Sequence, residues 1–187
     1  PPTPTPPPTL AQRPVRDSDD LGALPAAARA SDGVGVRLWR DDDGRLAGIA
    51  LAPGGEHPVF VAALAAPEPG DGMGGLFGGD APAAGEVPAP VRAVLEDPSV
   101  PKIGHDAHAD IGLLHGAGVA LRGIAFDTEL AAYLLGAGRR VGFPLHEVAA
   151  DTAGVRLDPP MERRERKGLD PAARAARERG EAVRAAE

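Results

Sequence analysis

The sequence predicts an α/β fold, a mixed β-sheet with an antiparallel three-strand meander and flanking helices. Residues 33–64 hold three apolar, alternating segments separated by short turns, which is typical of antiparallel strands. From residue 90 onward, helical patterns alternate with short apolar strands, which is typical of an α/β sheet. Together the two patterns indicate one sheet with antiparallel strands on one side.

Composition limits how much of the chain can form a core. The 187 residues suffice for one domain of ordinary size. Although 43% of the residues are apolar, only 3% are aromatic, so the core must depend on Val, Leu and Ile. The 25 glycines and 21 prolines make up about a quarter of the chain, near the level of low-complexity stretches. Part of the chain is therefore expected to lie outside the core.

The same composition argues against several classes of protein. Without cysteine there is no disulfide framework, no thiolate metal site and no cysteine nucleophile. The chain has no apolar run of the ~20 residues that a membrane helix needs, and it opens with no charged-then-apolar leader, so no membrane partner is expected. A net charge of −7 and a pI near 5.2 argue against a domain that coats a polyanion. Because the first residue is Pro1 rather than Met, a piece of a longer protein is expected.

Residues 1–25 differ in composition from the rest of the chain. Seven prolines within the first fourteen positions favour an extended polyproline conformation. We therefore expect a Pro-rich interdomain linker at residues 1–25 and one domain at residues 26–187. The P-x-x-P matches leave open the alternative of a ligand for a proline-reading domain.

The meander is predicted by three apolar segments. Residues 33–40 and 45–52 alternate on either side of an Asp-Gly turn, which is typical of a β-hairpin. After a Pro-Gly-Gly turn, residues 57–64 form the third strand.

Residues 65–87 are rich in Gly, Pro and acidic residues, and we expect a flexible insertion there. Met73, Leu76 and Phe77 within it leave open a docking role.

The second half of the chain predicts helices that alternate with strands. Asp106 caps one of these helices, with Ile111 and Leu114 facing inward. Residues 155–169 are charged and irregular, and they are expected to form a second flexible insertion. Helices are expected at residues 90–96, 107–117, 127–135, 144–150 and from 170 onward, with strands at 100–104 and 121–126.

A cluster of polar residues stands at the start of the helix that Asp106 caps. Imidazole and carboxylate groups can bind zinc or manganese, but their spacing here matches no compact zinc pattern. The favoured interpretation is a solvated helix start with exposed histidines. The serines lie in no G-x-S-x-G turn, and no phosphate-binding G-x-x-x-x-G-K-[ST] sequence is present. The cluster comprises His105, Asp106, His108, Asp110 and His115.

Residues 102–135 read KIGHDAHADIGLLHGAGVALRGIAFDTELAAYLL. This stretch resembles the 3′–5′ exonuclease-type domain of bacterial DNA polymerase I (family A). That domain has K-[VI]-G-x-[ND]-x-K, then G-[IV]-x-[FS]-D-T and L-x-x-Y-L. His108 departs from the pattern, which has a second Lys there. The similarity covers residues 28–187, and residues 1–25 stand where the family has a linker after its 5′-nuclease domain.

The resemblance implies a ribonuclease H-like exonuclease fold. In active members, four carboxylates hold two divalent metals that hydrolyse phosphodiesters. An Asp-x-Glu pair on the first strand supplies two of these carboxylates, but no register of residues 34–39 contains one. Asp110 matches the carboxylate of the second motif, and we treat it as a vestigial metal position. The third motif, Tyr-x-x-x-Asp, falls on Ala175 and Arg179, so three of the four carboxylates are absent.

The resemblance therefore implies a fragment of DNA polymerase I whose exonuclease-like domain is inactive and acts as a scaffold. We expect no catalytic residue and no cofactor in the fragment itself. The parent protein would use Mg²⁺ for template-directed DNA synthesis in replication and repair, in the nucleoid-associated cytoplasm. Its partners would be DNA and the flanking polymerase and 5′-nuclease modules.

Two alternatives stay open. One is a residual metal-dependent 3′–5′ exonuclease that combines Asp110 with residues 41–43 or His108. The other is a protein-docking module, unrelated to polymerases, that uses the Gly-rich insertion or the proline run.

Overall fold

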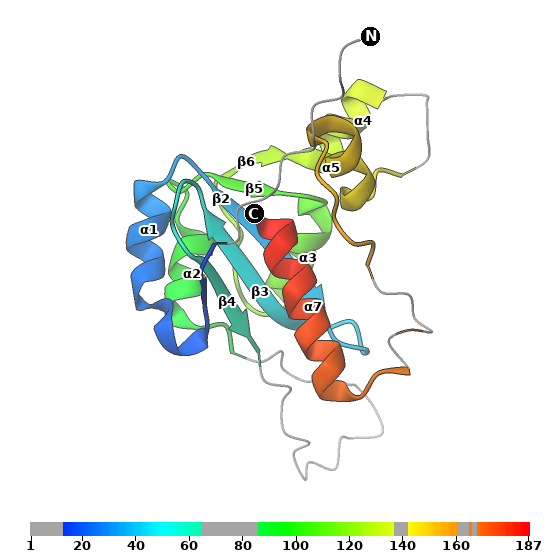
Figure 1. Cartoon of the computed structure of the whole chain (residues 1–187). Coiled ribbons are helices and arrows are strands. Elements are labelled where there is room, and N and C mark those ends of the chain that lie inside the picture. Colours follow the sequence, from blue (N-terminus) through cyan, green and yellow to red (C-terminus); the bar gives the residue numbers. More distant parts are fainter. Residues whose placement is uncertain (1–12, 65–85, 137–141, 161–164, 166–167) are drawn as a thin grey trace, which may run out of the picture.

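The computed structural model describes residues 13–64, 86–136, 142–160, 165 and 168–187 (Figure 1). Most of the Pro-rich linker, most of the Gly-rich insertion and part of the 155–169 insertion lie outside the described residues.

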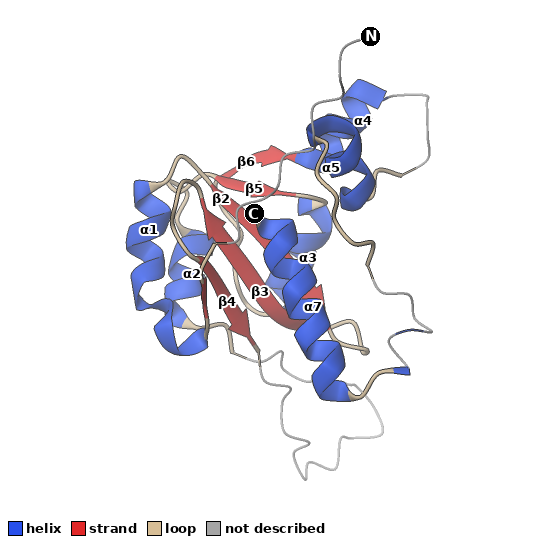
Figure 2. Cartoon of the chain, in the orientation of Figure 1, coloured by secondary structure: helices blue, strands red, loops and turns tan. Residues whose placement is uncertain are grey.

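A mixed sheet of six strands, in the order β1-β4-β3-β2-β5-β6, forms the centre of the described structure (Figure 2). The predicted meander is confirmed, because β3 pairs antiparallel with both β2 and β4. β5 pairs parallel with β2 and β6, and β1 pairs parallel with β4. The strands are β1 (Val15–Arg16), β2 (Val34–Arg40), β3 (Leu46–Pro53), β4 (Val59–Ala63), β5 (Lys102–Gly104) and β6 (Ile124–Asp127).

Helices cover both faces of this sheet (Figures 1 and 2). α1 and α2 pack together on one face, whereas α7 lies along β2, β3 and β4 on the other. α4 and α5 contact each other beside the β6 end of the sheet. The helices are η1 (Ser18–Ala23), α1 (Leu24–Ala30), α2 (Ala89–Glu96), α3 (Ala107–Gly116), α4 (Thr128–Gly136), α5 (Leu145–Ala153) and α7 (Pro171–Ala186).

Alternation along the strands divides the core into two layers. On β2, Val34, Val36 and Leu38 point toward α1 and α2 and are at most 6% exposed. On β3, Ala50 and Ala52 point the other way, into a smaller cluster with Ala182 and Ala186 of α7. The small alanines let α7 approach the sheet closely. Gly35 of β2 is part of this approach, because a Cβ at this position would overlap the carbonyl oxygen of Ala186.

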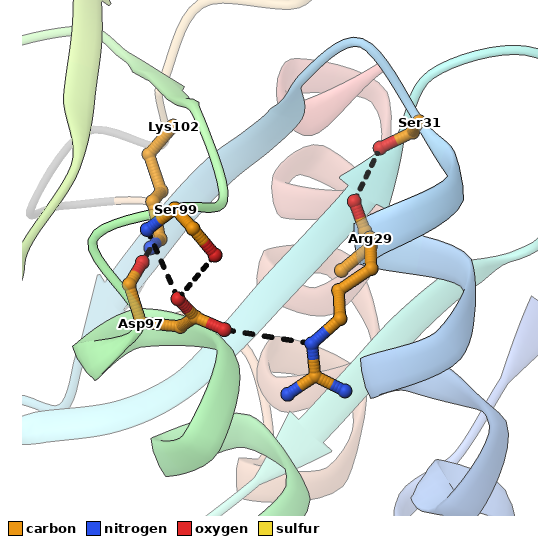
Figure 3. A network of polar contacts seen from close by, with 6 residues as sticks. Arg29, Ser31, Asp97, Ser99 and Lys102 are labelled. Atoms are coloured by element: carbon orange, nitrogen blue, oxygen red, sulfur yellow. Dashed lines mark hydrogen bonds and ion pairs between the residues drawn. The ribbon is translucent and has the colours of Figure 1, made fainter.

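Lys102, the first residue of β5, is 1% exposed. Its Nζ donates a hydrogen bond to the carbonyl oxygen of Asp97 at the C-terminal cap of α2 (Figure 3). The carboxylate of Asp97 accepts from the Ser99 backbone N–H and Oγ, and it pairs with Arg29 of α1 at 3.5 Å. Burial lowers the pKa of Lys102. This lysine is the first residue of the stretch 102–135. Its hydrogen bond therefore connects the end of α2 to the start of β5.

Three sequence predictions differ from the structure. Residues 13–25 are not linker but form β1, η1 and the start of α1, because Leu21 and Leu24 insert into the core at 3% and 0% exposure. The predicted inward position of Ile111 was wrong, since this residue is 43% exposed. The strand predicted at 121–126 begins only at Ile124, because Gly123 has a φ of +69° that interrupts the extended backbone.

Candidate functional site

A cleft of about 460 Å³ opens between the second half of β2, the starts of α3 and α5, and α7. Its walls carry side chains of both charges, including Arg37, Arg184, Asp106 and Glu178, together with the imidazole of His105. Asp110, the residue predicted to mark a vestigial metal position, lies on the first turn of α3 and is not on the cleft wall.

β2 presents Arg37 and Trp39 on the side that faces the cleft and α7. Their neighbours Val36 and Leu38 point into the opposite core, so the alternation of the strand assigns Arg37 and Trp39 to the same face. These are the positions, two residues apart, where an Asp-x-Glu pair would point both acids at the cleft. The sequence showed that no such pair exists, but not which two residues replace it.

Trp39 contributes packing rather than a metal ligand. A Cβ at Gly48 of β3 would overlap the six-membered ring of the Trp39 indole, so the ring lies directly over this glycine. Trp39 also packs against the apolar cluster that includes Ala50 and Ala182. The indole therefore fills space between β2, β3 and α7.

Asp110 is 9% exposed. Burial raises its pKa to about 7, and the charge of Asp106 acts in the same direction. The guanidinium groups of Arg37 and Arg40 oppose this shift. Near neutral pH, Asp110 is thus a partly protonated acid, whose pKa is raised by the charges of Asp106 and Asp127 as well as by burial.

The predicted helix cap is confirmed. Asp106 adopts a left-handed backbone conformation, with φ +62°, and its carboxylate accepts from the Ala109 N–H at 3.1 Å. Asp127, which ends β6, accepts from the Ala107 N–H and the Glu129 N–H, each at 2.8 Å. Burial tends to raise the pKa of Asp127, but these backbone bonds outweigh it and lower the pKa. Both carboxylates are therefore committed to the starts of helices.

The histidines do not converge on a metal. His105 is buried, and its Nδ1 lies 2.8 Å from Thr128 Oγ1. Burial, followed by the charge of Arg37, lowers the pKa of His105. His108 and His115 are exposed, as expected for a solvated helix start, but the same expectation was wrong for His105. Among the residues that the structure describes, no group of three His, Asp or Glu side chains is placed to hold a metal ion.

α7 presents a different face to the cleft from the one that the sequence alignment suggested. Ala175 is exposed, and Arg179 forms an ion pair with Asp17. The residues of α7 that line the cleft are Glu178, Glu181, Ala182, Arg184 and Ala185. Sequence reasoning missed the two glutamates, although the alanines at 182 and 186, four apart, mark the face that packs on the sheet.

The carboxylates of the acidic turn between β2 and β3 contact the turn itself and α7. Asp41 Oδ1 accepts from the backbone N–H groups of Asp43 and Arg45, at 2.9 and 2.8 Å. Asp42 forms an ion pair with Arg174 of α7. Neither these two acids nor Asp43 lines the cleft. Their carboxylates stabilise the turn and attach α7 to it.

Comparisons with known proteins place these observations in a family. A family model described as 3′–5′ exonuclease matches residues 44–161. DNA polymerase I of Mycobacterium bovis is 37% identical over 112 residues, which is 56% of this chain and 12% of that protein. DNA polymerase I of Chloroflexus aurantiacus is 42% identical over 52 residues, which is 28% of this chain and 6% of that protein. The chain therefore spans only a small part of the length of the curated relatives that it matches.

Solved structures share the fold. The POL domain of Pol1 from M. smegmatis, in complex with DNA primer-template and dNTP, aligns with a TM-score of 0.58 and 24% identity, over 79% of this chain and 23% of that one. Brucella melitensis NrnC aligns with a TM-score of 0.60 and 15% identity, over 91% and 76%. RNase D of Escherichia coli, an exoribonuclease involved in structured RNA processing, aligns at 0.56 and 20%, over 92% and 42%. The predicted ribonuclease H-like exonuclease fold is confirmed.

None of the described helices has the length and apolar character of a membrane span.

Proposed function

The chain belongs to the 3′–5′ exonuclease family, and from this membership we propose that it is a catalytically inactive exonuclease-like scaffold domain of a DNA polymerase I. The parent protein would carry out template-directed DNA synthesis in replication and repair, with Mg²⁺ and DNA bound by its polymerase module. It would work in the cytoplasm, at the nucleoid. Support for the parent comes from the relatives, which are DNA polymerase I proteins.

Inactivity is supported above all by Arg37 and Trp39 on the cleft-facing side of β2. Two-metal hydrolysis needs several carboxylates that clamp both ions around the attacking and leaving oxygens. Mg²⁺ binds hard oxygen ligands and gives up its water reluctantly, so a single carboxylate holds it poorly. Here an indole and a guanidinium replace two of the acids.

The charge of Arg37 is a second argument against binding of a divalent metal ion. The guanidinium acts on Asp110, the acid that matches the family's second motif. A fixed positive charge that acts on this carboxylate opposes the binding of a divalent cation there, and burial of Asp110 favours its neutral form. The scaffold role is supported by the packing that this region retains, since Trp39 and α7 pack on the sheet where the metals would lie.

A titration with Mn²⁺, followed by isothermal calorimetry, tests the loss of the metal site. We expect the wild-type chain and D110N to give the same heats, because Asp110 holds no ion. D158N is the matched control, since Asp158 is an exposed acid on the cleft wall and the substitution is the same. A stoichiometric Mn²⁺ site that disappears in D110N but persists in D158N would contradict the proposal.

A residual metal-dependent 3′–5′ exonuclease is the second candidate. Glu178 and Glu181 of α7 support it, because they line the cleft and supply acids that the alignment did not find. Similarity of fold to RNase D is compatible with it. Residues 41–43 and His108, which the sequence offered as substitute ligands, do not line the cleft. The hypothesis of a docking module unrelated to polymerases is disfavoured by the family membership.

A further inference from the structure

α7, which lies along the sheet in Figure 1, is attached in two different ways along its length. In its C-terminal half, residues 181–186, Ala182 and Ala186 are 4% and 6% exposed and pack against the sheet. A Cβ at Gly35 of β2 would overlap the carbonyl oxygen of Ala186. Just beyond the helix, Glu187 pairs with Arg13 at 3.4 Å, and both side chains are largely buried. Close packing therefore holds this half.

The N-terminal half of α7, residues 171–179, lacks this packing. Among the described side chains of α7, the first buried one is Ala182. Arg174 instead forms an ion pair with Asp42 of the β2–β3 turn, and Arg179 forms one with Asp17, which lies between β1 and η1. The alanines of this half are all exposed; they are Ala172, Ala173, Ala175 and Ala176.

Both long-range ion pairs are open to solvent, because the side chains of Asp42 and Asp17 are 57% and 66% exposed. Exposed pairs contribute little each, and dissolved salt screens them. Arg177 pairs within the helix with Glu181, and with Glu165 of the segment that precedes α7. The attachment of the N-terminal half is therefore expected to weaken as ionic strength rises.

Gly180 separates the two halves. The nearest atom to a Cβ built at this position is Nη1 of Arg184, at 4.0 Å, so close packing does not require a glycine here. Glycine inside a helix lowers its stability relative to alanine, because the unfolded backbone has more freedom to lose. Isolated helices shorter than about 12–15 residues are marginal in water, so the N-terminal half would not stay helical once detached.

We propose that the N-terminal half of α7 is a salt-sensitive flap, which detaches from the sheet and unwinds as far as Gly180 while the C-terminal half stays packed. Glu178 belongs to the flap and lines the cleft, so detachment widens the cleft at this wall. Asp17 and Asp42 lose their partners at the same time. This opening does not depend on whether the cleft holds a metal ion.

Hydrogen exchange of the purified chain, measured by mass spectrometry as protection factors, tests the flap. As NaCl rises from about 50 mM to about 500 mM, we expect the protection of amides 175–180 to fall several-fold, whereas residues 181–186 and β3 keep theirs. This direction is diagnostic, because the chain carries a net charge of −7 and screening of its self-repulsion would favour the folded state.

Variants assign the effect to the two ion pairs and to the glycine. R174Q R179Q should expose amides 175–180 at both salt concentrations and abolish their salt dependence. R92Q R122Q is the matched control, because it removes the same charge from residues 92 and 122, which lie outside α7, and it should behave as the wild type. G180A should raise the protection of amides 175–180 by about fivefold, since alanine favours the helix.

Other outcomes overturn the flap. Protection of amides 175–180 that does not change with salt, or that survives in R174Q R179Q, would show that the two ion pairs do not hold this half. An equal loss of protection across residues 175–186 would mean that α7 is released as one unit. The same loss in R92Q R122Q would assign the effect to overall charge.

Discussion

The carboxyl group of Asp110 gives the most direct residue-scale prediction. Burial raises its pKa to about 7, well above the value of 3.8 expected in the unfolded chain. Between these two values the folded state binds more protons than the unfolded state, so the free energy of unfolding falls as pH rises from about 4 to 7. Above pH 7 the buried carboxylate is ionised, and the free energy of unfolding has fallen by the full amount.

D110N removes this cost, because its amide does not ionise. We expect D110N and the wild type to have similar stability at pH 4, and D110N to be more stable by about 1–3 kcal/mol at pH 8. Urea unfolding at a series of pH values measures the difference. A constant difference across the series would mean that Asp110 ionises normally in the folded chain.

The residues of the candidate site were only partly predictable. Asp110 could be identified because residues 102–135 resemble a known domain. The cap at Asp106 follows from its place before an apolar helix. That Arg37 and Trp39 face the cleft depends on the register of β2 in the sheet. The two cleft-facing glutamates of α7 depend on how that helix rotates as it packs. Both are set by tertiary contacts, which a local pattern does not contain.

At the scale of elements, Trp39 and Gly48 join β2, β3 and α7. We expect G48A to destabilise the chain by about 1–3 kcal/mol, because the new Cβ would overlap the indole. In a W39A background the ring is gone, so the same substitution should be nearly neutral. A double-mutant cycle by chemical denaturation measures this coupling. Equal costs of G48A in both backgrounds would show that the indole does not lie over Gly48.

The elements themselves were largely predictable, for reasons that differ along the chain. Alternation and turn residues were sufficient for the three antiparallel strands. The helix expected from residue 170 onward is α7, and the structure shows that Asp170 caps it. The first ordered segment was missed because the density of prolines obscured the two buried leucines at 21 and 24. The apolar stripe of α4 predicted a helix but not its exposure, because burial depends on which neighbours exist.

For the whole molecule, the fold and the chemistry rest on different residues. The two apolar clusters lie on either side of the sheet, and none of their members supplies a metal-binding group. On the proposed function, loss of the catalytic carboxylates would leave the packing intact, and Trp39 adds to that packing. This separation would explain how a chain of the 3′–5′ exonuclease family keeps its architecture as a scaffold without its reaction.

The measurement that tests this account most directly is degradation of a 5′-labelled single-stranded oligonucleotide by the purified chain. The reaction is run in Mg²⁺ and then in Mn²⁺, beside D110A and E178Q, with an active 3′–5′ exonuclease as positive control. We expect no shortening by any form of the chain in either metal. Shortening from the 3′ end by the wild type that is lost in D110A or E178Q would contradict the central claim, and would show that the cleft still holds catalytic metal.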